Sequence, residues 1–334
     1  MNGEKARAMT AGCGATRDKP QCARILSVTG MRSELDCIKK QPHLIISKWL
    51  LQRHEERAYL SMIRAFIIFN RAFFILLLLA LSLTLNCEKC SENPPENALD
   101  ALLYSSDVTL IHQVPLQFAT YHVQGLELTE KFYFVTSVDK EQKSGWLFKI
   151  DRQNANLDSK IELTDRTLIH PGGLQFDGRY LWIPNAEYES QSRTMIYGVD
   201  PDNLEICTSF PVDDHIGAIA SNRKNLLYGI NWDALHFYTW DFDGHQLNKV
   251  DSPTSMAYQD IKYFAGTLLC SGHKDDDSVI DIIDPENWTL LKRIDLPQDA
   301  WKSTLGREGM AFDGNLYLLP DDGPDSRILI FALH

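Results

Sequence analysis

Hydrophobic and polar positions repeat five times between residues 108 and 334. The copies are "HVQGLELTEKFYFVTSVD", "HPGGLQFDGRYLWIPNAE", "HIGAIASNRKNLLYGINWD", "YQDIKYFAGTLLCSGHK" and "REGMAFDGNLYLLPDDG". They align on anchor residues spaced 48, 45, 42 and 49 positions apart, namely Gly125, Gly173, Ala218, Asp260 and Gly309. In each copy a short apolar strand leads through a turn rich in Gly or Asn to a second strand of aromatic and aliphatic β-formers. A period of this size is typical of propeller blades.

Two further strands follow in each of the first four copies. The third strand ends in an aspartate, as in "GWLFKID" and "TMIYGVD", and a more polar fourth strand comes next. The last copy ends after its third strand, "RILIFAL", whereas the segment "DVTLIHQVPLQ" before the first copy lacks a partner. We expect this segment to complete the fifth blade and remove an exposed edge. The sequence therefore predicts an all-β fold, a five-bladed β-propeller of four-stranded antiparallel blades closed by an N-terminal strand.

Two other folds compete with the five-bladed propeller. Six blades would need about 40 more residues at the observed period, which the segment before residue 107 does not supply. An irregular β-sandwich is the main competitor, and it leaves the regular spacing of the turns without an explanation.

The polar ends of the hairpins are the candidate functional residues. Strands alternate in direction, so the start of each first strand and the end of each second strand lie on one face, around the central channel. The first-strand candidates are His122, Gln124, His170, His215, Gln259, Asp260, Arg307 and Glu308. The second-strand candidates are Asn185, Glu187, Asn231 and Trp232, of which Trp232 could stack on a ligand. Further polar second-strand ends are Ser137, Asp139, Asp233, Ser271, His273, Asp321 and Asp322.

Such a ring of histidines and carboxylates can bind a cation, polarise a substrate or hold a sugar through hydrogen bonds. A divalent metal is the candidate cofactor, but no metal-ligand spacing such as HxxxH or an EF-hand occurs, so this prediction rests on the ring alone. In the alternative, structural interpretation, His122, His170 and His215 form hydrogen bonds between blades.

Charge divides the chain into two parts. Residues 1–71 carry thirteen Lys and Arg against six Asp and Glu, while the remaining 263 residues carry 20 against 39. Residues 72–85 form an uncharged apolar run that as a helix would span about 21 Å, short of the hydrocarbon core of a membrane. We interpret residues 62–86 as a signal peptide beginning at Met62. Residues 1–61 are then a misassigned start or an unusual extension; a cytoplasmic tail on an anchored protein is the alternative.

Cys87 follows "LSLTLN" directly, and this order resembles the lipobox of bacterial lipoproteins, with Asn86 where Gly, Ala or Ser is usual. The resemblance implies lipidation of Cys87 and a polar tether over residues 87–106. The repeat described above makes residues 107–334 the propeller domain. Cys87 and Cys90 also form a CxxC, but no second pair accompanies it. We expect an exported protein, secreted or held at the cell envelope by its lipid alone.

The segments "HVQGLEL", "HPGGLQFDGRYLWIPNAEY" and "REGMAFDGNLYLLPDDG" resemble an uncharacterised family of secreted bacterial and fungal β-propeller proteins, over about residues 109–333. The chain is more distantly similar to gluconolactonase-like propellers, whose metal site uses a Glu, two Asn and an Asp. Glu308, Asn185 and Asn231 are available for such a site, although their blade order differs from that pattern.

Two classes of function follow. The first is a propeller, expected to be monomeric, that binds a small polar ligand, a sugar or a protein partner at its polar face. The alternative is a metal-assisted hydrolase or lactonase, in which His170 or His215 and Glu308 hold an ion or act as base. The acidic propeller region argues against nucleic acid as a partner.

Overall fold

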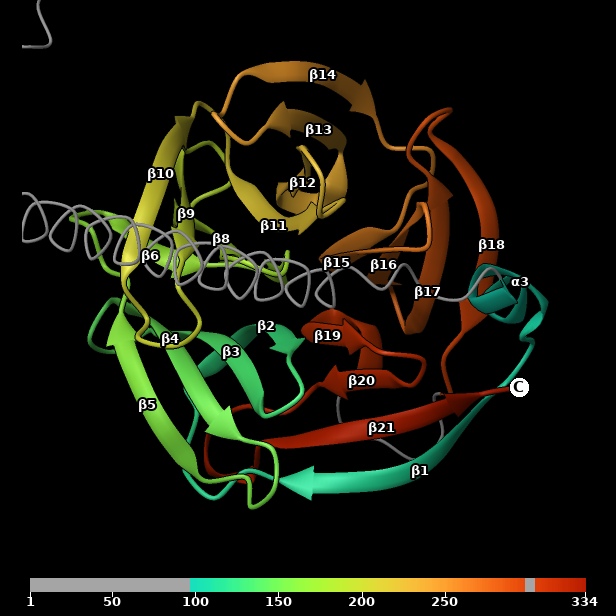
Figure 1. The fold of residues 1–334 in the computed structure, drawn as a ribbon, viewed down its shortest axis with the longest axis horizontal. Coiled ribbons are helices and arrows are strands. Elements are labelled where there is room, and N and C mark those ends of the chain that lie inside the picture. Colours follow the sequence, from blue (N-terminus) through green and yellow to red (C-terminus); the bar gives the residue numbers. More distant parts are fainter. Residues whose placement is uncertain (1–96, 298–303) are drawn as a thin grey trace, which may run out of the picture. The chain divides into compact units, whose positions relative to one another are not determined.

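The computed structural model describes residues 97–297 and 304–334, which form five antiparallel sheets around a common axis (Figure 1). Blade 1 consists of β2 (His122–Leu128), β3 (Phe132–Asp139), β4 (Ser144–Asp151) and β5 (Leu157–Glu162). Blade 2 consists of β6 (Leu168–Pro171) and β7 (Gln175–Phe176), which share the inner position, with β8 (Leu181–Glu187), β9 (Thr194–Val199) and β10 (Ile206–Val212). Blade 3 consists of β11 (Ile216–Ser221), β12 (Leu226–Asn231), β13 (His236–Asp241) and β14 (Gln246–Asp251).

Blades 4 and 5 complete the ring. Blade 4 consists of β15 (Ala257–Phe264), β16 (Thr267–Lys274), β17 (Asp277–Asp284) and β18 (Thr289–Asp295). Blade 5 consists of β19 (Gly309–Phe312), β20 (Leu316–Leu319), β21 (Arg327–Leu333) and β1 (Val108–Pro115). Short 3-10 helices are η2 (Trp232–Ala234), η3 (Leu305–Arg307) and η4 (Gly323–Asp325). Because β1 pairs antiparallel with β21, the N-terminal strand closes the ring, and the predicted five-bladed propeller is confirmed.

The hydrophobic core is divided among the five interfaces between neighbouring blades, because each sheet is apolar on both faces. Separate clusters of buried side chains join blades 1 and 2, 2 and 3, 3 and 4, 4 and 5, and 5 and 1. Trp182 of blade 2, for example, packs with Trp240 of blade 3, and both are almost fully buried. The fourth strands are the outermost and most exposed, which explains their polar sequences.

A helix precedes the first strand, and the sequence did not predict it. Helix α3 (Asn97–Tyr104) lies within the segment expected to be a polar tether. Leu102 is only 2% exposed and joins the cluster between blades 4 and 5, and Lys292 donates a hydrogen bond to the carbonyl oxygen of Leu103 at 2.6 Å. The end of the tether therefore packs on the propeller, because two leucines in its last turns offer apolar surface.

The predicted signal peptide, Cys87 and the first part of the tether lie outside the described residues, so these assignments stay predictions. Among residues 97–297 and 304–334, no helix combines the length and the apolar composition needed to cross a membrane.

The anchor residues of the repeat meet at the axis, where space is smallest. A Cβ on Gly125 or Gly309 would clash with the inner strand of the neighbouring blade, and one on Gly173 would clash with both Ala218 and Asp260. The inner segments of blades 2 and 3 are hydrogen-bonded here, since the Gly173 amide donates to the Gly217 carbonyl at 2.9 Å. Small residues are thus required at the glycine anchors, where the inner strands approach most closely.

Gly172→Ala is expected to lower the free energy of unfolding by about 2–3 kcal/mol, because its methyl group would collide with the backbone of Gly217, which cannot rotate away. The matched control is Gly217→Ala, whose methyl group has no neighbour closer than 3.9 Å and which should stay within about 1 kcal/mol of wild type. Urea unfolding measures both. Equal stability of the two variants would contradict this packing of the axis.

A cluster of buried polar side chains at the axis forms hydrogen bonds with all five blades. The Asp260 carboxylate accepts hydrogen bonds from the backbone amides of Leu126 and Met310 at 3.1 and 2.9 Å, in blades 1 and 5. Lys262 donates to Asp260 at 2.5 Å and to the carbonyl oxygen of Leu174 in blade 2 at 2.7 Å. Gln175 adds bonds to blades 3 and 4.

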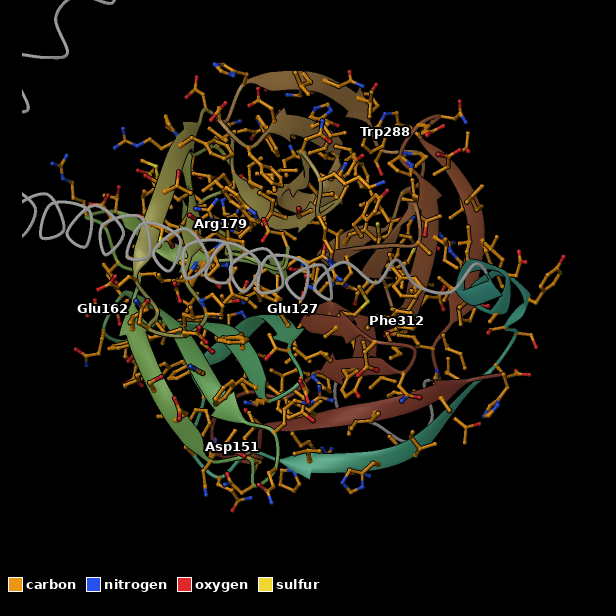
Figure 2. All side chains as sticks on the ribbon, in the orientation of Figure 1. Glu127, Asp151, Glu162, Arg179, Trp288 and Phe312 are labelled. Atoms are coloured by element: carbon orange, nitrogen blue, oxygen red, sulfur yellow. The ribbon has the colours of Figure 1, made fainter. Side chains whose placement is uncertain are left out.

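Glu127 belongs to the same cluster, where its carboxylate accepts a hydrogen bond from the backbone of Phe176 in blade 2 at 3.1 Å. Figure 2 shows it near the axis, whereas Asp151 and Glu162 lie at the outer rim. Burial raises the pKa values of Glu127 and Asp260, and the nearby Lys262 ammonium opposes both shifts. The cluster fills the channel with protein groups, so that a ligand can enter only at its ends.

Candidate functional site

A single cavity of about 740 Å³ lies at the end of the channel where the first strands begin and the second strands end. We call this end the mouth. Side chains from all five blades line the cavity. Nine of the twelve predicted site residues are among them: His122, Gln124, His170, His215, Asn231, Trp232, Gln259, Arg307 and Glu308.

β-Bulges in the first strands turn side chains toward the cavity. The register of the inner pair shifts between Val123 and Gly125 in blade 1 and between Tyr258 and Asp260 in blade 4. The extra residues at these two shifts are Gln124 and Gln259, and both line the cavity. Glu308, which precedes the anchor of blade 5 in the same way, also lines it. A bulge re-aims the side chain of its extra residue, and here it does so at equivalent places in the repeat.

Three predicted site residues do not line the cavity. Asp260 lies deeper, in the axial cluster, because it occupies an anchor position. Asn185 is fully buried and donates to the carbonyl oxygens of Leu163 and Leu168, so it supports the connection from blade 1 to blade 2. Glu187 accepts a hydrogen bond from Thr167 at 2.6 Å, across the end of its own hairpin.

Lys140 and Tyr188 line the cavity and were missed by the sequence analysis. Each follows the last residue of a second strand, Asp139 and Glu187 respectively. Counting one residue beyond each predicted strand end would have found both. His273, Asp322 and Asp233, noted above only as polar strand ends, also line the cavity.

His170 and His215 form a hydrogen bond in which the donor and the acceptor can be assigned. His215 Nδ1 lies 2.8 Å from the carbonyl oxygen of Glu189, which can only accept, so this nitrogen carries a proton. In the neutral ring, His215 Nε2 then accepts from His170 Nδ1 at 3.3 Å. Nε2 of His170 is left as an acceptor that no group among the described residues engages.

Burial keeps both rings neutral. It lowers the pKa of His215 to about 4, against opposing contributions from the Glu189 carbonyl and Asp214. Burial, with the nearby His215, His122 and Lys140, also holds the pKa of His170 well below its usual value. Near pH 7, His170 therefore presents a lone pair to the cavity.

Aromatic rings surround this histidine pair. Tyr188 meets His170 edge-on with ring centroids 4.4 Å apart, and Trp232 meets His215 edge-on at 4.5 Å. Trp232 is only partly buried and lines the cavity. It therefore offers apolar ring surface beside the His170 lone pair.

Glu308 is 9% exposed, and its carboxyl group has no hydrogen-bond partner or ion pair among the described residues. Burial raises its pKa to about 8, the Asp322 carboxylate adds to this shift, and Arg307 and Lys140 oppose it. At neutral pH, Glu308 is thus mostly a carboxylic acid that can donate a hydrogen bond.

The Asp322 carboxylate, by contrast, has a hydrogen-bond partner at each of its two oxygen atoms. His122 Nδ1 lies 2.9 Å from one carboxylate oxygen, and the Val123 amide donates to the other at 3.0 Å. Burial would raise the pKa of Asp322, but the hydrogen bonds with His122 and the Val123 amide hold it below the usual value. Glu308 and Asp322 thus line the same cavity with pKa values shifted in opposite directions.

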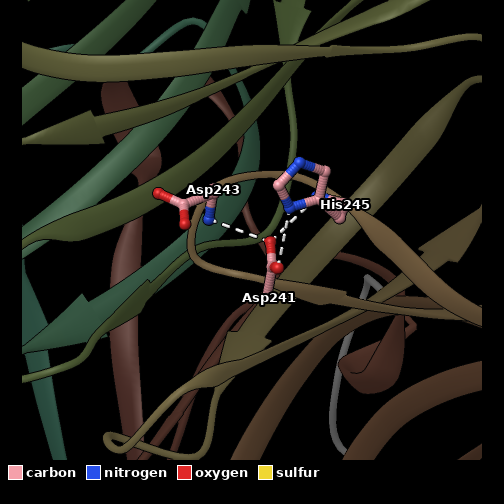
Figure 3. A group of neighbouring side chains, drawn as sticks. All are labelled: Asp241, Asp243 and His245. Carbon is pink, nitrogen blue, oxygen red and sulfur yellow. Dashed lines mark hydrogen bonds and ion pairs between the residues drawn. The ribbon is translucent and has the colours of Figure 1, made fainter. Parts of the chain in front are cut away.

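Among the described residues, one group of three ligand-type side chains could hold a metal ion, and it lies outside the cavity. Asp241, Asp243 and His245 meet in the turn between β13 and β14 (Figure 3). Asp241 accepts hydrogen bonds from the Asp243 and His245 amides and contacts the His245 ring at 2.9 Å. Asp151 and Asp200 occupy the equivalent position in blades 1 and 2, and each likewise accepts a hydrogen bond from the backbone amide two residues further along its turn. This aspartate therefore has a structural role in closing the turn.

Comparisons with known proteins agree with the fold. The model of a family of unknown function (DUF6454) matches residues 83–271. No curated protein matches the chain. The glutaminyl cyclase of Myxococcus xanthus has a TM-score of 0.52 and 14% sequence identity, over 68% of this chain and 96% of that chain. A gluconolactonase of Xanthomonas campestris has a TM-score of 0.43 and 15% identity, over 69% of this chain and 92% of that chain. At these identities the similarity concerns the fold alone.

Proposed function

The chain belongs to DUF6454, a family of unknown function, and we propose from the geometry of its cavity that it binds a small hydroxylated ligand of the sugar type at the mouth. One observation carries this proposal. A carboxyl group, Glu308, and an imidazole nitrogen, His170 Nε2, face one cavity without partners among the described residues. Buried polar groups normally have partners, so this pair points to a ligand that supplies them.

A hydroxyl group suits both positions, because it accepts from the neutral Glu308 and donates to His170. Gln124 and Gln259 add amide groups from two further blades, and each can donate and accept. Trp232 provides a ring against which the C–H surface of a sugar can pack. The volume of about 740 Å³ lies within the range of small-molecule sites.

A hydrolase or lactonase acting on such a ligand is the second candidate. The His122–Asp322 pair, with Asp322 fixing Nδ1, leaves His122 Nε2 as a base, and Glu308 is an acid in the same cavity. Among the described residues of the cavity, no three His, Cys, Asp or Glu side chains bring their ligand atoms within 4.8 Å of one another. Acid–base chemistry therefore fits these residues better than the metal-assisted variant, and binding, which both candidates require, is the first function to test.

We expect calorimetric titration of the full chain with a panel of neutral sugars, sugar alcohols and sugar acids to detect binding by at least one class. His170→Ala and Trp232→Ala should each weaken it about ten-fold, because one removes the acceptor and the other the ring. The control is Arg179→Gln, which lies at a separate hollow formed by the opposite ends of the hairpins. If no class binds, or if both cavity variants bind as the wild type does, the proposal is wrong.

A further inference from the structure

The cavity contains two cations that lack carboxylate partners. Lys140 and Arg307 both line it, both are exposed, and neither side chain forms an ion pair or a hydrogen bond with a described residue. Nζ of Lys140 lies 5.6 Å above the ring of Tyr188. Six other basic side chains among the described residues form ion pairs with carboxylates, as Arg293 does with Asp281 and Arg327 with Asp321. Lys140 and Arg307 thus place two cations without an ion pair in one cavity, although residues 72–334 contain 39 acidic and only 20 basic side chains.

The carboxyl groups of the described residues around these cations form no ion pair with them. Asp322 is bonded to His122 and to a backbone amide. The positive charges of Arg307 and Lys140 lower the pKa of Glu308, but burial has the larger effect, so that this carboxyl group remains mostly protonated at neutral pH. Asp233 also lines the cavity, but it is exposed and forms no ion pair with a described residue. Arg307 and Lys140 therefore line the cavity beside Glu308 as cations whose own charged atoms are not paired with a carboxylate of a described residue.

Resting on the proposed function, we infer that the ligand is a hydroxylated carboxylate, a sugar acid, whose carboxylate binds between Arg307 and Lys140 beside the Glu308 carboxyl group. The guanidinium group can donate two parallel hydrogen bonds to a carboxylate, and the ammonium group adds a third charged donor. Glu308 adds no repulsion while it is protonated, and it can donate to an oxygen of the ligand. The hydroxylated ring then extends toward Trp232 and His170.

A matched series of probes separates this inference from the proposed function. D-glucuronate, its methyl ester and D-glucose share one ring and differ at C6, where only glucuronate is charged. For the wild-type chain at pH 7 and 0.15 M salt, we expect calorimetry to show that glucuronate binds at least about ten-fold more tightly than glucose or the ester.

Arg307→Gln and Lys140→Gln should each reduce this preference, and the double variant should bind all three probes equally. Arg179→Gln, which removes a cation from the opposite end of the propeller, should retain the full preference. Because Arg307 and Lys140 are exposed and unpaired, their replacement should leave the unfolding curve unchanged, which urea titration checks.

The possible results of these titrations distinguish the carboxylate inference from the proposed function. If glucose and the ester bind as tightly as glucuronate, the carboxylate inference is wrong while the proposed function stands. If the preference survives in the double variant, Arg307 and Lys140 do not bind the carboxylate, and the inference is again overturned. If acetate competes at the same concentration as glucuronate, the site recognises any carboxylate, and the assignment to a sugar acid fails. If neither these probes nor the wider sugar panel binds, the proposed function itself fails.

Discussion

Replacing Asp260 by alanine is expected to lower the free energy of unfolding by about 4 kcal/mol, because it leaves a buried lysine without its counter-charge. Lys262 is 2% exposed and Asp260 is fully buried, and their charged atoms lie 2.5 Å apart. The variant also removes the acceptor of the Leu126 and Met310 amides, two donors buried at the axis. Their unsatisfied hydrogen bonds add to the cost.

Urea unfolding of three variants separates these contributions. Lys262→Met should cost about 3 kcal/mol, since Asp260 keeps its two amide donors but loses the ammonium group. The double variant Asp260→Asn with Lys262→Met removes both charges and should lie closer to wild type than the two single changes together imply. A cost below about 1 kcal/mol for Asp260→Ala would show that the axial cluster does not hold the blades together.

Replacing Glu308 by glutamine is expected to stabilise the protein on the order of 4 kcal/mol at pH 9 and to change nothing at pH 4. Burial raises the pKa of Glu308 from its ordinary value of 4.5 to about 8 in the folded protein. The folded state therefore retains a proton that the unfolded state releases between these values. The stability that this proton contributes is complete below about pH 4.5 and is lost as the pH rises through 8, whereas glutamine cannot ionise.

Denaturant unfolding of wild type and Glu308→Gln at pH 4, 7 and 9 measures this difference. The lowered pKa values of His170 and His215 act in the opposite direction, since their stabilisation is lost as the pH falls from 6.5 toward 4. Both proteins share those histidines, so the comparison cancels their effect. Glu130→Gln, at an exposed site, is the control and should show no such trend. A Glu308→Gln difference that is constant with pH would contradict the buried, protonated carboxyl group.

The repeat could be predicted because it follows from local chemistry. Four of the five inner strands carry Gly or Ala where they converge, so Gly125, Gly173, Ala218 and Gly309 mark the axis in the sequence itself. Alternating strand direction then places the histidines of the first three blades on one face. That inference needs only the period and the order of strands.

Which of the predicted site residues line the cavity depends on where side chains point within that face, and the period does not encode this. Asp260 occupies an anchor position, and a residue there points to the axis and not to the mouth. Asn185 lies opposite Pro171 and binds backbone carbonyls between blades 1 and 2. The raised pKa of Glu308 and the direction of the His170–His215 hydrogen bond could not be predicted either, since both depend on burial by distant segments.

A crystal structure of the protein grown with D-glucuronate is the most direct test of the central claim that the five blades build one ligand site at the mouth. We expect the sugar ring beside Trp232, its carboxylate within hydrogen-bond distance of Arg307, and one hydroxyl group bound to His170 Nε2. Glucuronate bound outside this cavity, or a cavity filled by the protein's own side chains, would contradict the account.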